Sequence, residues 1–86
     1  MFYIDDEAHA ELQPGEFPTL DGAVEELKRR AAILWNEAPN IAPCSGWRTC
    51  GRVYQIVEYD ATTQPWTEIQ RLAALDISSH GVVWHI

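Results

Sequence analysis

Both cysteines lie close together, at Cys44 and Cys50, in the sequence PCSGWRTCG. Two neighbouring thiols could hold a metal ion, form a disulfide or supply a reactive thiolate. Structural zinc usually takes four ligands, with cysteines two to four residues apart, whereas five residues separate this pair and there is no second pair. Arg48 and Arg52 would help to stabilise a thiolate, but no Cys-x-x-Cys motif occurs. We expect both thiols to be buried as small hydrophobic residues, and we keep redox or metal binding by Cys44 and Cys50 as the alternative.

A tryptophan and an arginine, Trp47 and Arg48, lie side by side between the two cysteines. Both residue types are enriched at the hot spots that carry most of the affinity of a binding surface. Arg52 follows in the same region, and Trp66 lies in a second segment without periodicity. We therefore predict a binding surface formed by Trp47, Arg48, Arg52 and Trp66. The alternative is that the two tryptophan rings fold back and cover the ends of a small core.

The charge of the chain limits the ligands that such a surface would bind. Thirteen acidic residues against six basic ones give a net charge of −7. Nucleic acids and anionic membranes bind through clustered Lys and Arg, so we expect neither as a partner. Residues 1–26 carry eight acids and no base, whereas residues 27–52 carry five bases and only Glu37 as an acid. The basic segment predicts either a charged helix end or, near Arg48 and Arg52, a site for a protein or a small anionic ligand.

The other residues that could do chemistry form no recognisable active site. No nucleophile elbow, phosphate-binding loop, dinucleotide fingerprint or His-Glu-x-x-His motif occurs. The acidic triplet at residues 5–7 could bind a divalent cation weakly, although such runs are usually solvated turn residues. His9, His80 and His85 would add metal ligands only if the fold gathered them. We therefore predict no catalytic residue, no metal and no cofactor, and a protein that is not an enzyme.

The length and composition predict a single small globular domain. The chain has 86 residues, of which 47% are hydrophobic and 22% charged. The longest apolar run, AAILW at residues 31–35, is too short to span a membrane. The N-terminal sequence MFYIDDEA lacks the basic and apolar regions of a secretory signal, so we expect a cytoplasmic protein.

The strongest periodicity predicts a helix over residues 20–37. Thr19 is suited to the N-cap position, and Pro39 would end the helix. Trp35 lies at the edge of an apolar stripe with helical spacing, whose members are Leu20, Val24, Leu27, Ala31, Leu34 and Ala38. The opposite side carries two acid–base pairs at i,i+4 spacing, Glu25 with Arg29 and Glu26 with Arg30.

Aromatic and β-branched residues predict strands at residues 2–5 and 52–60. Weak alternation near residues 10–13 leaves a further short strand open. Residues 39–51, with two prolines and two glycines, are typical of a long irregular connection, and residues 61–65 of a turn.

The C-terminal part allows two interpretations. We favour strands at roughly 69–78 and 82–86, joined by the sequence SSHG with Gly81 at a positive φ. Three cross-strand pairs would then lie on one inner face of the sheet, with Trp84 in the core: Ile77 with Val82, Leu75 with Trp84, and Ala73 with Ile86. The alternative is a helix over residues 67–74.

These elements predict a two-layer α+β domain with one amphipathic helix on a three- or four-stranded antiparallel sheet, in the order β-α-β-β-β. The leading functional hypothesis is a small non-enzymatic cytoplasmic module that binds an unknown protein or a small anionic ligand through the 39–51 loop. A free sheet edge could serve the same end, or pair with a second copy of the chain. The alternative hypothesis is a thiol-dependent redox or metal-binding protein.

Overall fold

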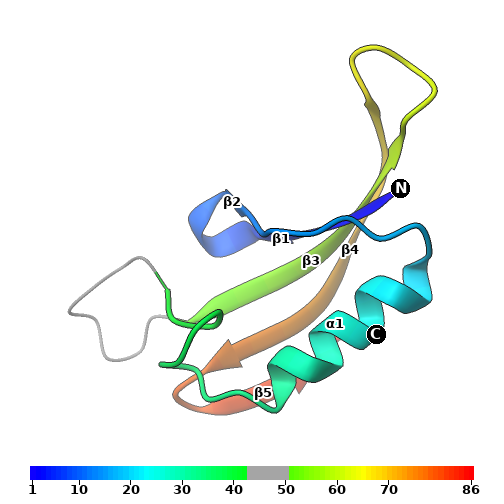
Figure 1. The fold of residues 1–86 in the computed structure, drawn as a ribbon. Coiled ribbons are helices and arrows are strands. Elements are labelled where there is room, and N and C mark those ends of the chain that lie inside the picture. Colours follow the sequence, from blue (N-terminus) through cyan, green and yellow to red (C-terminus); the bar gives the residue numbers. More distant parts are fainter. Residues whose placement is uncertain (43–50) are drawn as a thin grey trace.

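The computed structural model describes residues 1–42 and 51–86 as an antiparallel sheet with one helix on one face (Figure 1). Within these residues the sheet has five strands, in the order β2-β1-β3-β4-β5. The elements in chain order are β1 (Phe2–Asp6), the 3-10 helix η1 (Glu7–His9), β2 (Glu11–Leu12), α1 (Leu20–Ala31), β3 (Arg52–Asp60), β4 (Thr67–Ser78) and β5 (Gly81–Trp84). The predicted α+β fold is confirmed, and β2 takes the sheet beyond the three or four strands that we expected.

The molecule is elongated because the hairpin of β3 and β4 projects beyond the rest of the sheet (Figure 1). Its principal extents are 41 × 22 × 19 Å. β1 accompanies β3 as far as Glu58, and the N–H group of Tyr59 donates to the carbonyl of Met1 at 2.9 Å. Beyond this point the hairpin is a two-stranded arm that ends in the predicted turn at residues 61–65.

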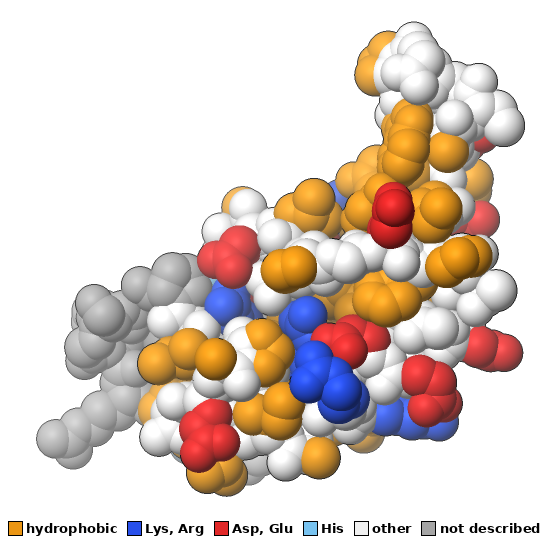
Figure 2. Space-filling view, in the orientation of Figure 1, with side chains coloured by type: hydrophobic (Ala, Val, Ile, Leu, Met, Phe, Trp, Pro, Cys, Tyr) orange, Lys and Arg blue, Asp and Glu red, His pale blue; other side chains and the backbone are white. Residues whose placement is uncertain are grey.

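α1 begins as predicted. The hydroxyl of Thr19 accepts a hydrogen bond from the N–H group of Gly22 at 3.1 Å, which satisfies one free donor of the first turn. Glu26 pairs with Arg30, as expected, and also with Arg29. The predicted pair of Glu25 and Arg29 is therefore wrong, since Glu25 pairs with Lys28 instead. Acidic and basic side chains accordingly lie next to one another over α1 (Figure 2).

α1 ends at Ala31 rather than at residue 37. The side chain of Asn40 is buried and donates to the main-chain carbonyls of Arg30 and Ile33, both at 2.9 Å. These carbonyls at the helix end are satisfied by a side chain, so no further helical turn is needed. α1 has 12 residues, and the described part of the chain contains no helix that is long and apolar enough to cross a membrane.

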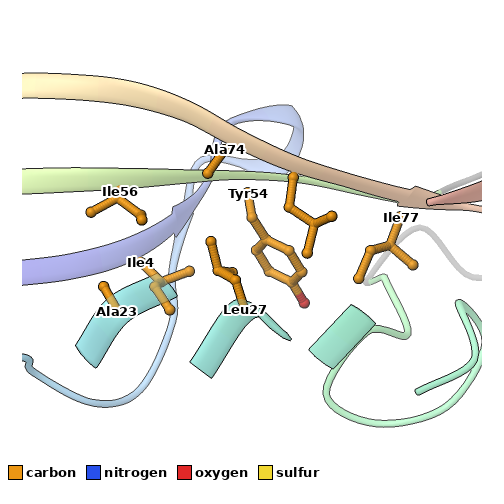
Figure 3. Packing of buried hydrophobic residues seen from close by; sticks show 8 residues of the cluster. Ile4, Ala23, Leu27, Tyr54, Ile56, Ala74 and Ile77 are labelled. Carbon is orange, nitrogen blue, oxygen red and sulfur yellow. The ribbon is translucent and has the colours of Figure 1, made fainter. Parts of the chain in front are cut away.

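The core lies between α1 and the sheet (Figure 3). Figure 3 shows Ala23 and Leu27 on α1 directed toward the strands, with the ring of Tyr54 beside Leu27. The buried cluster consists of Ile4, Ala23, Leu27, Tyr54, Ile56, Ala74, Leu75 and Ile77. Trp35 packs against this cluster, as predicted from its position beside the stripe.

The predicted apolar stripe is right in its centre and wrong at its ends. Leu27 is fully buried, but Leu20 is 38% and Leu34 is 62% exposed, and Ala38 is also exposed. Leu34 and Ala38 lie beyond the end of the helix, so the helical spacing no longer directs them at the sheet.

β4 and β5 form the predicted hairpin, and the helix alternative for residues 67–74 is wrong. Val82 is paired with Ile77 and Trp84 with Leu75, as expected, and Gly81 has a positive φ of 117°. The strand boundaries shift slightly, because β4 begins at residue 67 and β5 covers residues 81–84.

The third predicted pair, Ala73 with Ile86, is wrong. A bulge in β4 leaves Ala74 without a partner on β3, and Ala73 is paired with Gln55. One extra residue reverses the face on which the following side chains lie. Ala74 therefore enters the core, while Ala73 lies on the face opposite α1.

Candidate functional site

A buried ion pair joins the start of β3 to the end of β1. Arg52 is 6% exposed and donates from Nη1 to Oδ2 of the fully buried Asp6 at 2.9 Å. The other carboxylate oxygen accepts the main-chain N–H groups of Ala8 and Val53, both at 3.1 Å. His9 Nδ1 lies 2.6 Å from Oδ2. The carboxylate is thus surrounded by donors, as a buried charge requires.

The same guanidinium group holds the chain next to residues 43–50. Its Nε donates to the carbonyl of Asn40 at 3.2 Å, and its Nη2 to the carbonyl of Ile41 at 2.8 Å. On the other side, Gly51 packs so closely that a Cβ atom there would lie 2.2 Å from the carbonyl oxygen of Ile77. The buried side chain of Arg52 therefore fixes residues 39–41, and backbone packing fixes Gly51.

Asn40 extends this network beneath the end of α1. Its Oδ1 accepts a hydrogen bond from the hydroxyl of Tyr54 at 3.1 Å. The guanidinium of Arg30, itself 3% exposed, lies 5.1 Å from the centroid of the Tyr54 ring. Arg30 also donates to Gln13 at 3.0 Å and to Glu26 at 2.7 Å. Polar groups from both layers of the fold thus form a connected network in which each is satisfied by its neighbours.

Electrostatics keep the central groups of this network in fixed protonation states. Burial raises the pKa of Asp6, but hydrogen bonds from Arg52 and from the Val53 N–H outweigh it, and the pKa lies below its usual value. Burial lowers the pKa of Arg52, but its hydrogen bond to Asp6 raises it above the usual value. Burial raises the pKa of Tyr54 despite the opposing charge of Arg30. Asp6 and Arg52 are therefore ionised at neutral pH, and Tyr54 is neutral.

The predicted binding surface is not gathered into one patch among the described residues. Arg52 lies at the start of β3 and Trp66 beyond its end, so they are separated by roughly 25 Å, the length of a nine-residue strand. Their roles in binding stay predictions. Four of the residues that we singled out lie outside the described residues, namely Cys44, Trp47, Arg48 and Cys50.

Trp66 takes part in an aromatic cluster at the base of the arm. Its ring centroid lies 5.8 Å from that of Tyr3 and 6.4 Å from that of Tyr59, and the two tyrosines are 5.7 Å apart. The hydroxyl of Tyr3 donates to Glu16 at 2.8 Å. Trp66 is 39% exposed, so one side of the ring packs against the tyrosines while the other faces solvent. These contacts support the projecting arm.

The acidic triplet at residues 5–7 is divided between the buried network and the surface of the protein. Asp6 belongs to the buried network, whereas Asp5 accepts a hydrogen bond from Arg71 at 2.7 Å and Glu7 accepts one from Gln55 at 2.9 Å. Within residues 1–42 and 51–86, no three His, Cys, Asp or Glu side chains are grouped so that they could hold a metal ion.

The surface of β5 is a second candidate site. All of its residues are exposed, and no strand in the described part of the chain lies beyond it. Val82, Val83 and Trp84 are 41%, 55% and 39% exposed, and Ile86 is 54% exposed. The prediction that Trp84 lies in the core is wrong, because Trp84 is 39% exposed and lines an open pocket beside α1 rather than being covered by the helix.

Sequence reasoning expected a free sheet edge but not its position. The available signal was the run VVW at residues 82–84, which is apolar on both faces of the strand. Proteins usually protect an edge with Lys, Pro or a bulge. Neither Lys nor Pro occurs in β5.

A pocket of about 380 Å³ lies between β5 and α1. The end of the chain runs beside α1, which places the last residues at this pocket (Figure 1). Its lining is mostly apolar, with one acidic and one basic residue: Leu20, Val24, Trp84 and Ile86, together with Asp21 and Lys28. Such a depression is suited to apolar side chains of a partner.

Comparison of the chain with protein-family models, with curated proteins and with solved structures found no match. The function is therefore inferred from the residues and the geometry described above. Two regions stand out, the buried network beside residues 43–50 and the exposed edge at β5.

Proposed function

We propose that this chain is a small non-enzymatic protein-interaction module that binds its partner through the free edge of β5 and the adjoining pocket. The observation that carries this proposal is the exposure of every residue of β5, of which Val82, Val83 and Trp84 are large and apolar. Contiguous apolar surface on a small protein typically marks an interaction site. The cytoplasm stays the proposed compartment, from the sequence alone.

Strand addition is the mode of binding that this edge favours. An edge strand offers unpaired N–H and C=O groups, and a partner strand would satisfy them with main-chain hydrogen bonds. Val82 and Trp84 are paired with the core residues Ile77 and Leu75, so their side chains lie on the face that carries α1. Val83 lies on the other face. A partner strand would therefore gain apolar contacts on both faces of the sheet.

The 39–51 loop, with Trp47 and Arg48, stays a second predicted contact region. Its support is the fixed position of the chain on either side of residues 43–50, where Arg52 binds the carbonyls of Asn40 and Ile41. Binding residues are often carried by loops that a rigid scaffold positions. The thiol hypothesis for Cys44 and Cys50 also stays a prediction, and no contact of the described residues favours it.

Site-specific photo-crosslinking in the cell that makes the protein tests this proposal. A photoreactive residue in place of Val83 would lie on the β5 edge. The same residue in place of Leu34, which is 62% exposed beyond the end of α1, is the control for exposed apolar positions. We expect a defined protein adduct from position 83 and none from position 34.

The mass of the adduct separates a foreign partner from a second copy of the chain. An adduct of either mass at position 83 supports an interaction module. Adducts absent from position 83, or equal at both positions, would overturn the proposal.

A further inference from the structure

We propose that the partner of the β5 edge is a second copy of this chain, in a twofold dimer that joins the two sheets. This inference rests on the proposed function, since it names the occupant of the same edge and pocket. A twofold axis brings the same patch of both copies together, so the patch must be complementary to itself. The residues at β5 meet this requirement in backbone pairing, in apolar contact and in charge.

Backbone pairing is satisfied by an antiparallel arrangement of the two β5 strands. The sheet is antiparallel throughout the described residues and has β5 at its edge. A twofold axis perpendicular to the sheet makes adjacent identical strands antiparallel, so the sheet continues from one copy into the other without changing its type. Both copies of α1 then lie on the same face of the joined sheet.

Apolar contact is supplied by the pocket beside β5. Val24 lies in the middle of the pocket lining on α1, and Trp84 and Ile86 line it from the strand side. An axis that passes beside these residues brings the two pockets face to face. Trp84, at 39% exposed, and Ile86, at 54% exposed, would then fill the space between the two copies of α1.

Charge is what favours a second copy over an unrelated apolar segment. Asp21 and Lys28 line the same pocket and are seven residues apart on α1, which is roughly 10 Å along the helix axis. The twofold axis reverses the direction of the second helix. The acidic end of each pocket therefore faces the basic end of the other, with Asp21 opposite Lys28 of the partner subunit. Lys28 also pairs with Glu25 at 3.1 Å, but both side chains are largely exposed, and such pairs hold a lysine weakly.

The first experiment measures the mass of the protein in solution by sedimentation equilibrium over a range of concentrations. We expect a reversible monomer–dimer equilibrium. Val83→Lys places a charge on the edge and should shift the sample to monomer. Leu34→Lys makes the same change at an exposed position away from the edge and should leave the dimer intact.

The second experiment reverses the charges of the proposed pair. Asp21→Lys alone and Lys28→Glu alone each place like charges opposite one another, and each should weaken the dimer by about tenfold or more. An equimolar mixture of the two variants restores both attractive pairs and should form a heterodimer nearly as tight as the original dimer. Glu37→Lys changes the net charge as much as Asp21→Lys does, but at a position away from the pocket. It should have little effect on the strength of the dimer.

Several results would overturn the dimer. They are a chain that stays monomeric at millimolar concentration, a dimer that Leu34→Lys disrupts as much as Val83→Lys, and mixed charge variants that fail to associate. Each of these leaves the interaction module standing if crosslinking at position 83 yields a foreign partner. If crosslinking at position 83 yields only an adduct with a different protein, the proposed interaction module is supported and the dimer is contradicted.

Discussion

At the β1 edge of the sheet the chain covers its own strand, whereas at the β5 edge it leaves a strand open. Residues 11–17 run along the outside of β1, where Gln13 donates to the carbonyl of Ile4 at 2.9 Å and Phe2 and Phe17 exchange two main-chain hydrogen bonds of 2.7 and 2.8 Å. In the described part of the chain, no strand pairs with the outer side of β5. One edge is thus closed by backbone pairing, and the other is free to accept a strand.

The side chains of the buried network and those of the β5 edge reverse the usual relation between polarity and burial. Beside the closed edge, Asp6, Arg52 and Asn40 are buried. At the open edge, Val83 and Trp84 are exposed. Buried polar groups and exposed apolar patches are the informative exceptions in a small protein. The difference teaches that polar contacts are concentrated in the buried network that holds residues 39–41, while apolar surface is left on the β5 edge that we propose for binding.

The largest expected effect comes from Arg52→Met, which removes the buried ion pair of Arg52 with Asp6. Methionine keeps much of the apolar volume but leaves the buried Asp6 carboxylate without the guanidinium group of Arg52. Removing one member of a buried ion pair typically costs about 3–5 kcal/mol, so we expect a loss of that order in the free energy of unfolding, measured by urea denaturation. A loss below about 1 kcal/mol would show that this ion pair contributes little to the stability of the fold.

A smaller loss is expected when the middle of the network is removed by Asn40→Ala. The change leaves the carbonyl of Ile33 and the hydroxyl of Tyr54 without their Asn40 partner, whereas the carbonyl of Arg30 keeps the main-chain N–H of Ile33 at 3.0 Å. We expect a loss of about 2 kcal/mol, because each buried group left unsatisfied costs about 1–3 kcal/mol. Tyr54→Phe is the matched control, since it removes only the contact to Asn40 and should cost about 1 kcal/mol. Equal losses in the two variants would mean that Asn40 does not satisfy the end of α1.

The fold could largely be predicted from the sequence because periodicity reports which side of an element faces the core. Strand 52–60 followed from its aromatic and β-branched residues, and the pairing of Leu75 with Trp84 followed from the SSHG turn and the residues that flank it. The end of α1 did not, because it depends on Asn40, whose partners lie six to ten residues earlier in the chain. The bulge at Ala74 has no local signal in sequence, and it decides which side chains of β4 enter the core.

The candidate site was harder to predict because exposure depends on which elements cover one another. Trp84 has the residue type and the spacing of a core position, but it lines an open pocket beside α1 and is left 39% exposed. Arg52 is the converse case. Its residue type is typical of the surface, but its side chain is buried against Asp6, which is 46 residues away in sequence. Long-range pairing of this kind cannot be deduced from spacing.

Acid should destabilise the buried network around Asp6. The pKa of Asp6 lies below its ordinary value of 3.8 in the folded protein. The ionised carboxylate therefore stabilises the fold above the unfolded pKa, and this contribution is lost as the pH falls through the folded pKa. We expect the free energy of unfolding to fall below about pH 4, and to fall less steeply in Asp6→Asn.

Part of the acid sensitivity should remain in Asp6→Asn, since hydrogen bonds from Arg29 and Arg30 also lower the pKa of Glu26. The test therefore uses the difference in the free energy of unfolding between the original protein and Asp6→Asn at each pH, measured by urea denaturation. An unchanged pH profile in Asp6→Asn would show that Asp6 is not the group that links stability to acid.

The smallest expected effect is that of Val83→Thr at the open edge. Threonine has nearly the same shape as valine, so the substitution tests burial alone. The same change at Val57, which lies on the same face of the sheet but is fully buried, removes a hydroxyl from water and should cost about 1–3 kcal/mol. Val83 is 55% exposed, and its change should alter the unfolding free energy of the monomer by less than about 0.5 kcal/mol. Measurement at a concentration where the protein is monomeric is essential, because a dimer stabilises the fold by mass action. If Val83→Thr were as costly as Val57→Thr in the monomer, the β5 edge would be part of the packed core rather than a surface free to bind.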